Sequence, residues 1–127
     1  MAVFPTLDFT QIKARYPKGI KKITEWIFAQ PELQSVTEDF VDNRNPEASK
    51  EMFTGLLIQM DPRKLYDIFD SLNIIVSVDY DPQMNQWFHW VHILNTLDVS
   101  NAGAAPSRHT AEVTALHDAF EILEKQL

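Results

Sequence analysis

The chain contains no cysteine among its 127 residues. It can therefore form neither a disulfide framework nor a site that depends on a thiolate, which fits a reducing cytoplasm. Glycine is almost as scarce, because only Gly19, Gly55 and Gly103 are present and each is isolated. This excludes a glycine-rich loop that cradles a phosphate. No window approaches the roughly 18 apolar residues of a membrane-spanning helix.

The first residues, MAVFPTLDF, lack both the basic flank and the long apolar run of a signal peptide. We therefore expect a soluble, cytoplasmic protein with no membrane partner. The motifs of serine hydrolases, zinc proteases and EF-hands are absent as well, and no internal repeat marks a solenoid. The pattern predicts no catalytic residues, no cofactor and no metal.

Basic residues are fewer than acidic ones, and the net charge is −7 at pH 7. An acidic surface repels the phosphate backbone, so nucleic acid is disfavoured as a partner. The basic residues gather near the start, where residues 1–24 hold Lys13, Arg15, Lys18, Lys21 and Lys22 against the single acid Asp8. This cluster is either a solvated face paired with acidic parts of the same chain or a local binding face.

With 45% apolar and 23% charged residues, the chain has the composition of one globular domain over residues 1–127. Periodicity and capping residues predict helices at about 7–16, 17–30, 32–42, 46–59, 62–72 and 108–127. The buried stripes expected are Ile20, Ile23 and Ile27, then Leu65, Ile68, Phe69 and Leu72, then Val113, Leu116, Phe120, Leu123 and Leu127. The core face expected for residues 46–59 is Met52, Phe53, Leu56, Leu57 and Met60.

Between residues 73 and 95 the pattern changes from a period of 3.6 to a period of two. Ile74, Val76 and Val78 share one face of a first strand at residues 73–80. Five residues then form a hairpin loop, and a second strand runs to about residue 95. The next five residues either continue that strand or form a third one. The small, glycine-containing segment at residues 101–105 is interpreted as a mobile loop.

The expected fold class is α+β. A small antiparallel β-sheet, made of the hairpin at about 73–80 and 86–95 with or without a third strand, packs against several α-helices including a long C-terminal helix. A sheet of two or three strands leaves open edges. The strand at 86–94 has neither lysine nor proline to protect an edge. We therefore predict that the chain covers this edge by dimerising or by pairing with a further strand.

His89 and His92 form an H-x-x-H pattern within the second strand. Because side chains alternate along a strand, the odd spacing directs the two imidazoles to opposite faces, which is poor geometry for a shared metal. His89 could instead meet Asp79 or Ser77 across the hairpin, and an aspartate can orient an imidazole as a general base. Since no nucleophile stands at a recognisable turn, the alternative is a pair of locally hydrogen-bonded strand histidines.

Three aromatic residues, Trp87, Phe88 and Trp90, fall within four positions of this strand. Alternation places Trp87 on one face and the other two on the opposite face. One set is then expected in the core, and the other is either a docking surface or simple packing. The candidate binding residues are Trp87, His89, Trp90, His92 and Asp79.

The second half of the chain has helices, a hairpin and a terminal helix ending AFEILEKQL. This layout looks like small bacterial or phage-associated domains, and the resemblance implies no activity. The leading hypothesis is a non-enzymatic protein-interaction module, such as an adaptor, an inhibitor or an immunity-type protein. Its aromatic strand would contact a protein partner or a second copy, and its acidic surface would suit a basic partner. The alternative is a small enzyme or ligand-binding domain whose pocket between sheet and helices uses His89 and Asp79.

Overall fold

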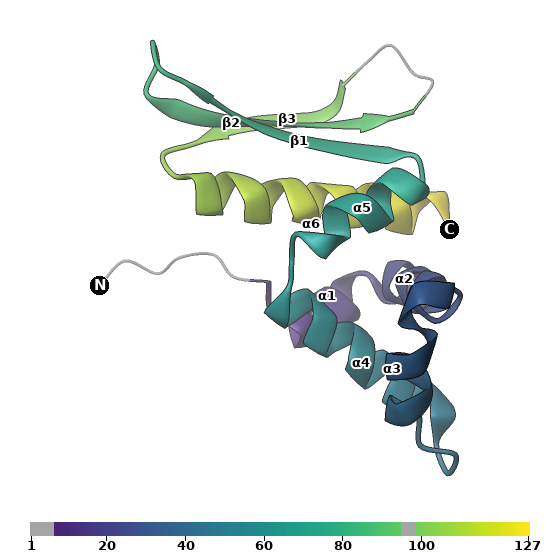
Figure 1. Ribbon diagram of the computed structural model, residues 1–127. Coiled ribbons are helices and arrows are strands. Elements are labelled where there is room, and N and C mark those ends of the chain that lie inside the picture. Colours follow the sequence, from purple (N-terminus) through teal and green to yellow (C-terminus); the bar gives the residue numbers. More distant parts are fainter. Residues whose placement is uncertain (1–6, 95–98) are drawn as a thin grey trace.

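Figure 1 shows the layers of the computed structural model, which describes residues 7–94 and 99–127. The elements in chain order are α1 (Phe9–Arg15), α2 (Pro17–Phe28), a 3-10 turn (Pro31–Leu33), α3 (Gln34–Phe40), α4 (Pro46–Met60), α5 (Lys64–Ser71), β1 (Ile74–Asp81), β2 (Gln86–Ile93), β3 (Val99–Ala105) and α6 (Arg108–Gln126). The sheet lies on α6, α5 lies beside α6, and α1 to α4 form the lowest layer. The predicted α+β class is confirmed, because an antiparallel sheet packs against helices that include the long α6.

The helices begin where a side chain can accept hydrogen bonds from the free N–H groups of the first turn. Asp8 caps α1, since its Oδ1 accepts from the backbone N–H of Thr10 at 2.9 Å. Asn45 caps α4 directly before Pro46, and Ser107 caps α6. Local capping residues therefore explain where these three helices start.

Helix α2 takes its cap from the far end of the chain. Tyr16 precedes it and makes no side-chain capping bond. Glu124, near the end of α6, accepts hydrogen bonds from the backbone N–H groups of Lys18 at 3.1 Å and Gly19 at 2.7 Å. A carboxylate at this position also interacts favourably with the helix dipole. The contact joins α6 to the lower helical layer.

The sheet has the order β1-β2-β3, and both neighbouring pairs are antiparallel. Strands β1 and β2 form the predicted hairpin, with Asp79 opposite Phe88 and Ser77 opposite Trp90. Asn85 turns the chain with a φ of 51°, a left-handed conformation that asparagine tolerates. Strand β2 is central. Of the two predicted ways to cover its edge, pairing with a further strand is therefore confirmed, and no second copy is needed there.

The interpretation of residues 101–105 as a loop is wrong, because they belong to β3. Their small side chains have little strand propensity of their own. They suit this place because Gly103 lies opposite His89, where a Cβ atom would come within 2.7 Å of imidazole Cε1. Packing therefore overrides local composition. Of the third strand considered at residues 96–100, residues 96–98 lie outside the described residues, and residues 99–100 begin β3.

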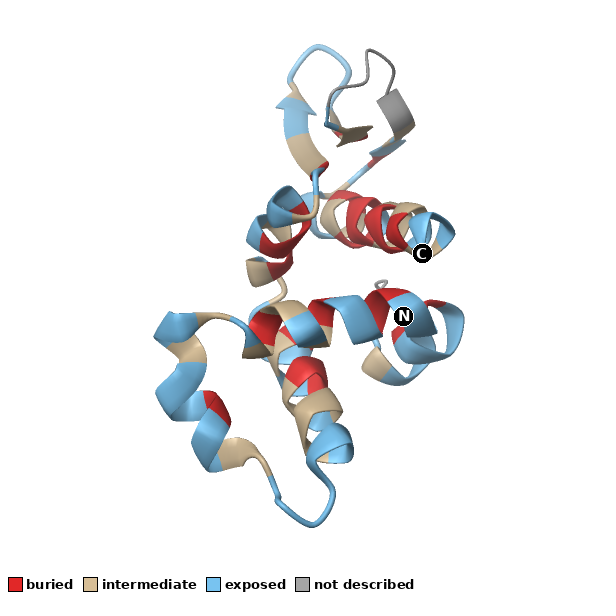
Figure 2. Cartoon of the chain, turned by 90° about the vertical axis from the view of Figure 1, so that its right-hand side faces the viewer, coloured by how far each residue is buried: buried red, intermediate tan, exposed pale blue. Residues whose placement is uncertain are grey.

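Helix α6 lies at the centre of the core, since the sheet covers one side, α2 contacts the opposite side, and α5 lies beside it and also contacts β1 (Figure 1). Phe120 of α6 packs edge-to-face against Phe69 of α5, with ring centroids 5.1 Å apart, and stacks on Tyr16 at 5.5 Å. Figure 2 shows buried residues running along most of α6. The isoleucine stripe predicted for α2 is confirmed. Leu127, predicted as the last member of the α6 stripe, is 49% exposed instead.

The core face predicted for α4 is wrong in part, since only Phe53 and Leu57 of its five residues pack against the core. Three of its five residues are exposed: Met52 (61%), Leu56 (42%) and Met60 (81%). The residues that α4 buries are Thr54, Gly55 and Ile58. Small side chains face inward because they allow a close approach to neighbouring helices. A Cβ atom on Gly55 would lie 2.5 Å from Cδ2 of Phe9, and Oγ1 of Thr54 lies 2.7 Å from Oγ1 of Thr24.

Candidate functional site

The sheet has an inner face toward α6 and an outer face that no described element covers (Figure 1). Directly opposed residues of an antiparallel pair lie on the same face. The predicted separation of the aromatics is confirmed, since Trp87 lies on the inner face and Phe88 and Trp90 lie on the outer one. We define the outer sheet face by Ile75, Ser77, Asp79, Phe88, Trp90, His92, Ala102 and Ala104.

His89 is a buried polar residue on the inner face and is only 3% exposed. Its Nε2 lies 2.7 Å from Oδ2 of Asp118 on α6. The predicted contact of His89 with Asp79 or Ser77 is wrong, because both of these residues belong to the outer sheet face. Nδ1 of His89 has no hydrogen-bond partner among the described residues. Since the imidazole is buried, the His89–Asp118 pair attaches the sheet to α6.

The two histidines of β2 do not share a site. His92 stands opposite Ile75 on the outer sheet face, whereas His89 points toward α6. Strand alternation separates them as predicted. Within residues 7–94 and 99–127, no three histidine or carboxylate side chains gather closely enough to hold a metal ion.

Aromatic side chains occupy the centre of the outer sheet face. The rings of Phe88 and Trp90 stack with centroids 6.2 Å apart and an interplanar angle of 24°. Both residues are half-buried, and neither belongs to the hydrophobic core cluster. Their neighbours on β3 are the small Ala104 and Ala102, which cannot cover the rings. The rings therefore form an apolar surface outside the core.

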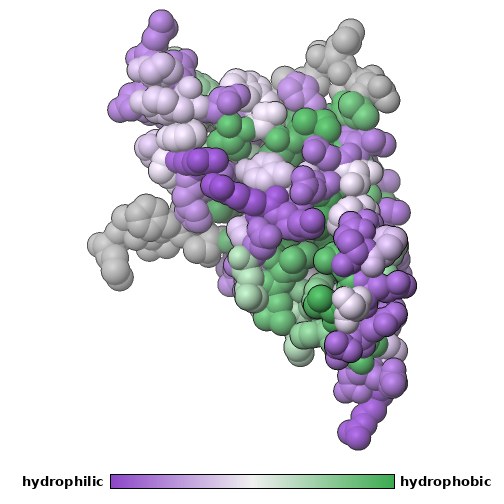
Figure 3. All heavy atoms as spheres, in the orientation of Figure 1, coloured by the Kyte–Doolittle hydropathy of each residue, from purple (hydrophilic) through white to green (hydrophobic). Residues whose placement is uncertain are grey.

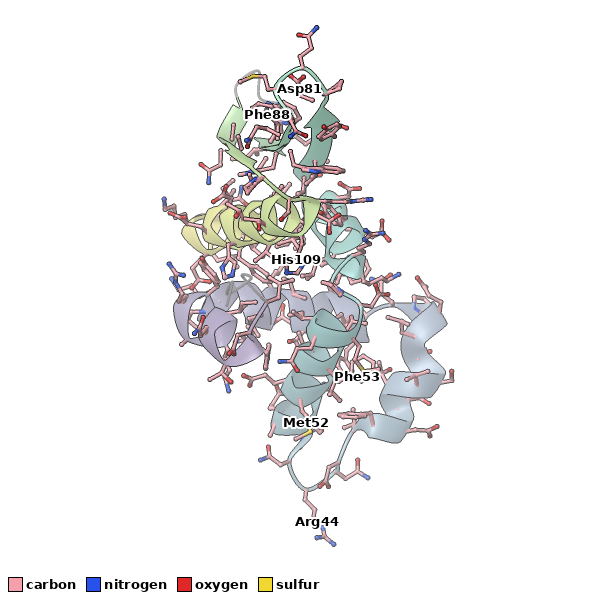
Figure 4. All side chains as sticks on the ribbon, turned by 90° about the vertical axis from the view of Figure 1, so that its left-hand side faces the viewer. Arg44, Met52, Phe53, Asp81, Phe88 and His109 are labelled. Carbon is pink, nitrogen blue, oxygen red and sulfur yellow. The ribbon has the colours of Figure 1, made fainter. Side chains whose placement is uncertain are left out.

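An open pocket of about 400 Å³ lies at the hairpin end of this surface. It is lined by Asp79, Tyr80, Asp81, Pro82, Phe88 and Trp90. Figure 4 shows Phe88 and Asp81 near each other at this end of the molecule. Two of the lining residues are aspartates, and residues 73–107 contain neither lysine nor arginine. The outer sheet face is thus an aromatic surface with an acidic border.

Trp87 is held at the end of the inner face. Its ring contacts the ring of Tyr80 at 5.2 Å, and the guanidinium of Arg108 lies 5.7 Å from its centroid. Such a cation–π contact orients the indole toward the start of α6.

Of the predicted binding residues, the structure places Trp90, His92 and Asp79 on one surface and separates them from Trp87 and His89.

A second apolar surface runs along α4. We call it the α4 stripe, and it consists of Met52, Leu56 and Met60. Figure 3 shows apolar side chains gathered on this side of the helical layer. Phe53 points instead toward α3, where its ring contacts Phe40 at 5.2 Å (Figure 4). Beside the stripe Lys13, one of the clustered bases, pairs with Glu51. Sequence reasoning missed this surface because it assigned the stripe to the core.

A pocket of about 420 Å³ lies between α6 and the helices beneath it. The end of α4, the start of α5 and the first half of α6 line it, and Figure 4 shows His109 at this boundary. The hydroxyl of Tyr66 is buried there without a hydrogen-bond partner among the described residues. Burial, together with the negative charge of Glu112, raises the pKa of Tyr66 to about 12. The sequence offers no signal for this site, because Tyr66 merely adjoins the buried stripe of α5.

Another polar contact links the layers near Arg15. The hydroxyl of Tyr16 lies 3.4 Å from Nδ1 of His117. Burial lowers the pKa of His117 and the positive charge of Arg15 lowers it further, whereas Asp118 opposes this shift. Burial also raises the pKa of Tyr16. The fold therefore favours the neutral forms of both side chains.

No protein-family model, curated protein or solved structure matches this chain. No helix among the described residues combines the length and the apolar character needed to cross a membrane. What the protein binds is therefore inferred from its own surfaces and pockets.

Proposed function

We propose that the protein is a non-enzymatic interaction module that binds a basic segment of a partner protein on the outer sheet face. The observation that carries this proposal is the stacked pair of Phe88 and Trp90 on a sheet whose outer side is open in the described structure. Aromatic side chains supply a large contact area at low entropic cost and often dominate the binding energy of protein interfaces.

The charge pattern favours a basic partner. Asp79 and Asp81 border the aromatic rings, and residues 73–107 contain no lysine or arginine. A lysine or arginine of the partner would meet a carboxylate and the face of an aromatic ring, and both attract cations. Two copies joined through this face would bring aspartates together, so like charges oppose self-association.

Peptide display against the folded protein tests this proposal. The selected peptides should carry lysine or arginine next to apolar residues, and their affinity should fall as salt is added. The variant Asp79→Lys replaces an exposed negative charge with a positive one. It should lower the affinity for a selected peptide by about tenfold or more, because it places like charges opposite each other. Fluorescence anisotropy of the labelled peptide measures the loss.

Two further variants make the result decisive. Glu38→Lys applies the same charge change to an exposed position on α3 and should alter the affinity by less than about twofold, since salt screens distant surface charges. Leu56→Glu places a charge in the α4 stripe. Binding that is lost in Leu56→Glu but kept in Asp79→Lys would refute the proposed surface. Selected peptides without basic residues would refute the proposed partner chemistry.

The alternative predicted from the sequence, a ligand-binding or catalytic site, relies on His89 and Asp79 together. These residues lie on opposite faces of the sheet, so they do not form one site. The pocket beside Tyr66 is a more suitable site for a small molecule than a site made of His89 and Asp79.

A further inference from the structure

The pocket between α6 and the helices beneath it has the size and the walls of a small-molecule site. Its volume is about 420 Å³. Ligand pockets typically measure roughly 300–1,000 Å³ and combine apolar walls with a few polar groups. Ile58, Val113 and Leu116 form part of the wall and are at most 5% exposed. This wall therefore belongs to the packed interior and holds a defined shape.

Tyr66 lines this pocket, and its hydroxyl is a polar group that needs a partner. It is buried and has no hydrogen-bond partner among the described residues. Such a group is costly, because folding has removed its hydrogen bonds to water. With its pKa raised to about 12, the hydroxyl keeps its proton at neutral pH and can donate a hydrogen bond. If the side chain of Tyr66 turned its hydroxyl toward the pocket, a ligand oxygen could accept this bond and remove the cost.

The charged groups around the pocket already have partners. Oε1 of Glu112 accepts a hydrogen bond from Nε of Arg108 at 3.0 Å and lies 3.6 Å from Nη2 of Arg63. The carboxylate of Asp8 accepts hydrogen bonds from the first turn of α1. A charged ligand would disturb these pairs and would also lose its own hydration. An uncharged ligand leaves these pairs in place and loses much less hydration.

We propose that this pocket binds a small neutral molecule with an apolar body and one carbonyl oxygen, which accepts a hydrogen bond from Tyr66. The site lies beneath α6, whereas the outer sheet face lies on the far side of the sheet from α6. A test of one proposed site therefore does not depend on whether the other site binds its partner.

Acetophenone and ethylbenzene are matched probes, because they share the ring and the two-carbon side chain and only acetophenone has a carbonyl. Each is titrated into the isotope-labelled full chain and into Tyr66→Phe, and the amide chemical shifts give the dissociation constants. We expect Tyr66→Phe to weaken acetophenone by about tenfold, the effect of one net hydrogen bond, and to leave ethylbenzene unchanged or tighter. Comparing the same probe between variants cancels the difference in hydration between the probes.

Tyr16→Phe is the control variant. It removes a hydroxyl that lies 3.4 Å from Nδ1 of His117 and does not line this pocket, so neither probe should respond. Nuclear Overhauser effects from bound acetophenone to the methyl groups of Val113 and Leu116 should place it in this pocket. The proposal is overturned if neither probe binds, if these effects arise elsewhere, or if Tyr66→Phe changes both affinities equally.

Discussion

Replacing Gly103 with alanine tests how the sheet is attached to α6. Gly103 stands on β3 directly opposite His89, and its φ is not positive, so alanine acts only through the added Cβ atom. That atom would lie 2.7 Å from Cε1 and 3.3 Å from Nδ1 of the imidazole. The ring cannot move aside freely, because it is buried and its Nε2 lies 2.7 Å from the carboxylate of Asp118.

Two responses to the added methyl group are open. Either β3 moves away from β2, or His89 rotates and gives up its contact with Asp118. Overpacking a core costs about 1–3 kcal/mol, and a buried polar group that loses its partner costs about as much. Alanine also restricts the conformations of the unfolded chain, which offsets about 0.4–1 kcal/mol of this loss of stability. We therefore expect the free energy of unfolding to fall by about 2 kcal/mol and Tm to fall by roughly 6–10 °C.

Urea denaturation followed by circular dichroism measures this change. Gly19→Ala is the matched control, because the atom nearest to its Cβ would lie 3.4 Å away and alanine favours a helix, so it should not lower the stability. Adding His89→Ala removes the obstructing ring, so the double variant should show a coupling energy of about 1–2 kcal/mol. The reasoning fails if Gly103→Ala costs no more than Gly19→Ala, or if the two substitutions are additive.

Three other predictions use the same denaturation assay. Glu124→Ala should cost about 1–2 kcal/mol because it removes the cap of α2, and Glu124→Gln should cost less because it keeps an acceptor oxygen. Ile58→Ala should lower the free energy of unfolding by about 2–5 kcal/mol, because the side chain of Ile58 is only 1% exposed. Met60→Ala should lower it by less than about 0.5 kcal/mol, because Met60 is 81% exposed. Equal losses would contradict the observed burial of α4. Because folding lowers the pKa of His117, the unfolded chain binds its proton more readily, and stability falls as the pH drops through about 6.5. Between about pH 7.5 and about pH 5.5 the wild type should therefore lose more stability than His117→Gln.

The helices and the first two strands follow from local signals. The Asn45–Pro46 pair predicts the start of α4, and the structure places the helix there. The spacing of Leu65, Ile68 and Phe69 predicts the buried side of α5, and all three are buried. These predictions succeed because capping and periodicity depend only on residues within a turn or two of one another.

The packing of the sheet on the C-terminal helix is predicted correctly, but predictions about individual contacts between residues distant in sequence fail or are missing. Most of strand β3 is interpreted as a loop because Gly103 and its alanine neighbours have no strand preference until His89 stands opposite them. The buried side of α4 is predicted wrongly because the helix carries more apolar residues than one face can bury. Which of them turn inward depends on the close approach that Gly55 permits toward Phe9. The pocket beside Tyr66 is formed by several elements, so no single segment signals it.

Strand β2 shows which features the sequence determines and which depend on the tertiary structure. Alternation by itself determined that Trp87 and Trp90 point to opposite faces, and that His89 and His92 do the same. Only the tertiary structure decided that the Trp90 side is the open one, that His89 bonds to Asp118 on α6, and that β3 covers the remaining edge of β2. The physical reason is that backbone periodicity sets the direction of a side chain relative to its own strand. What that side chain meets depends on segments that the fold brings opposite it.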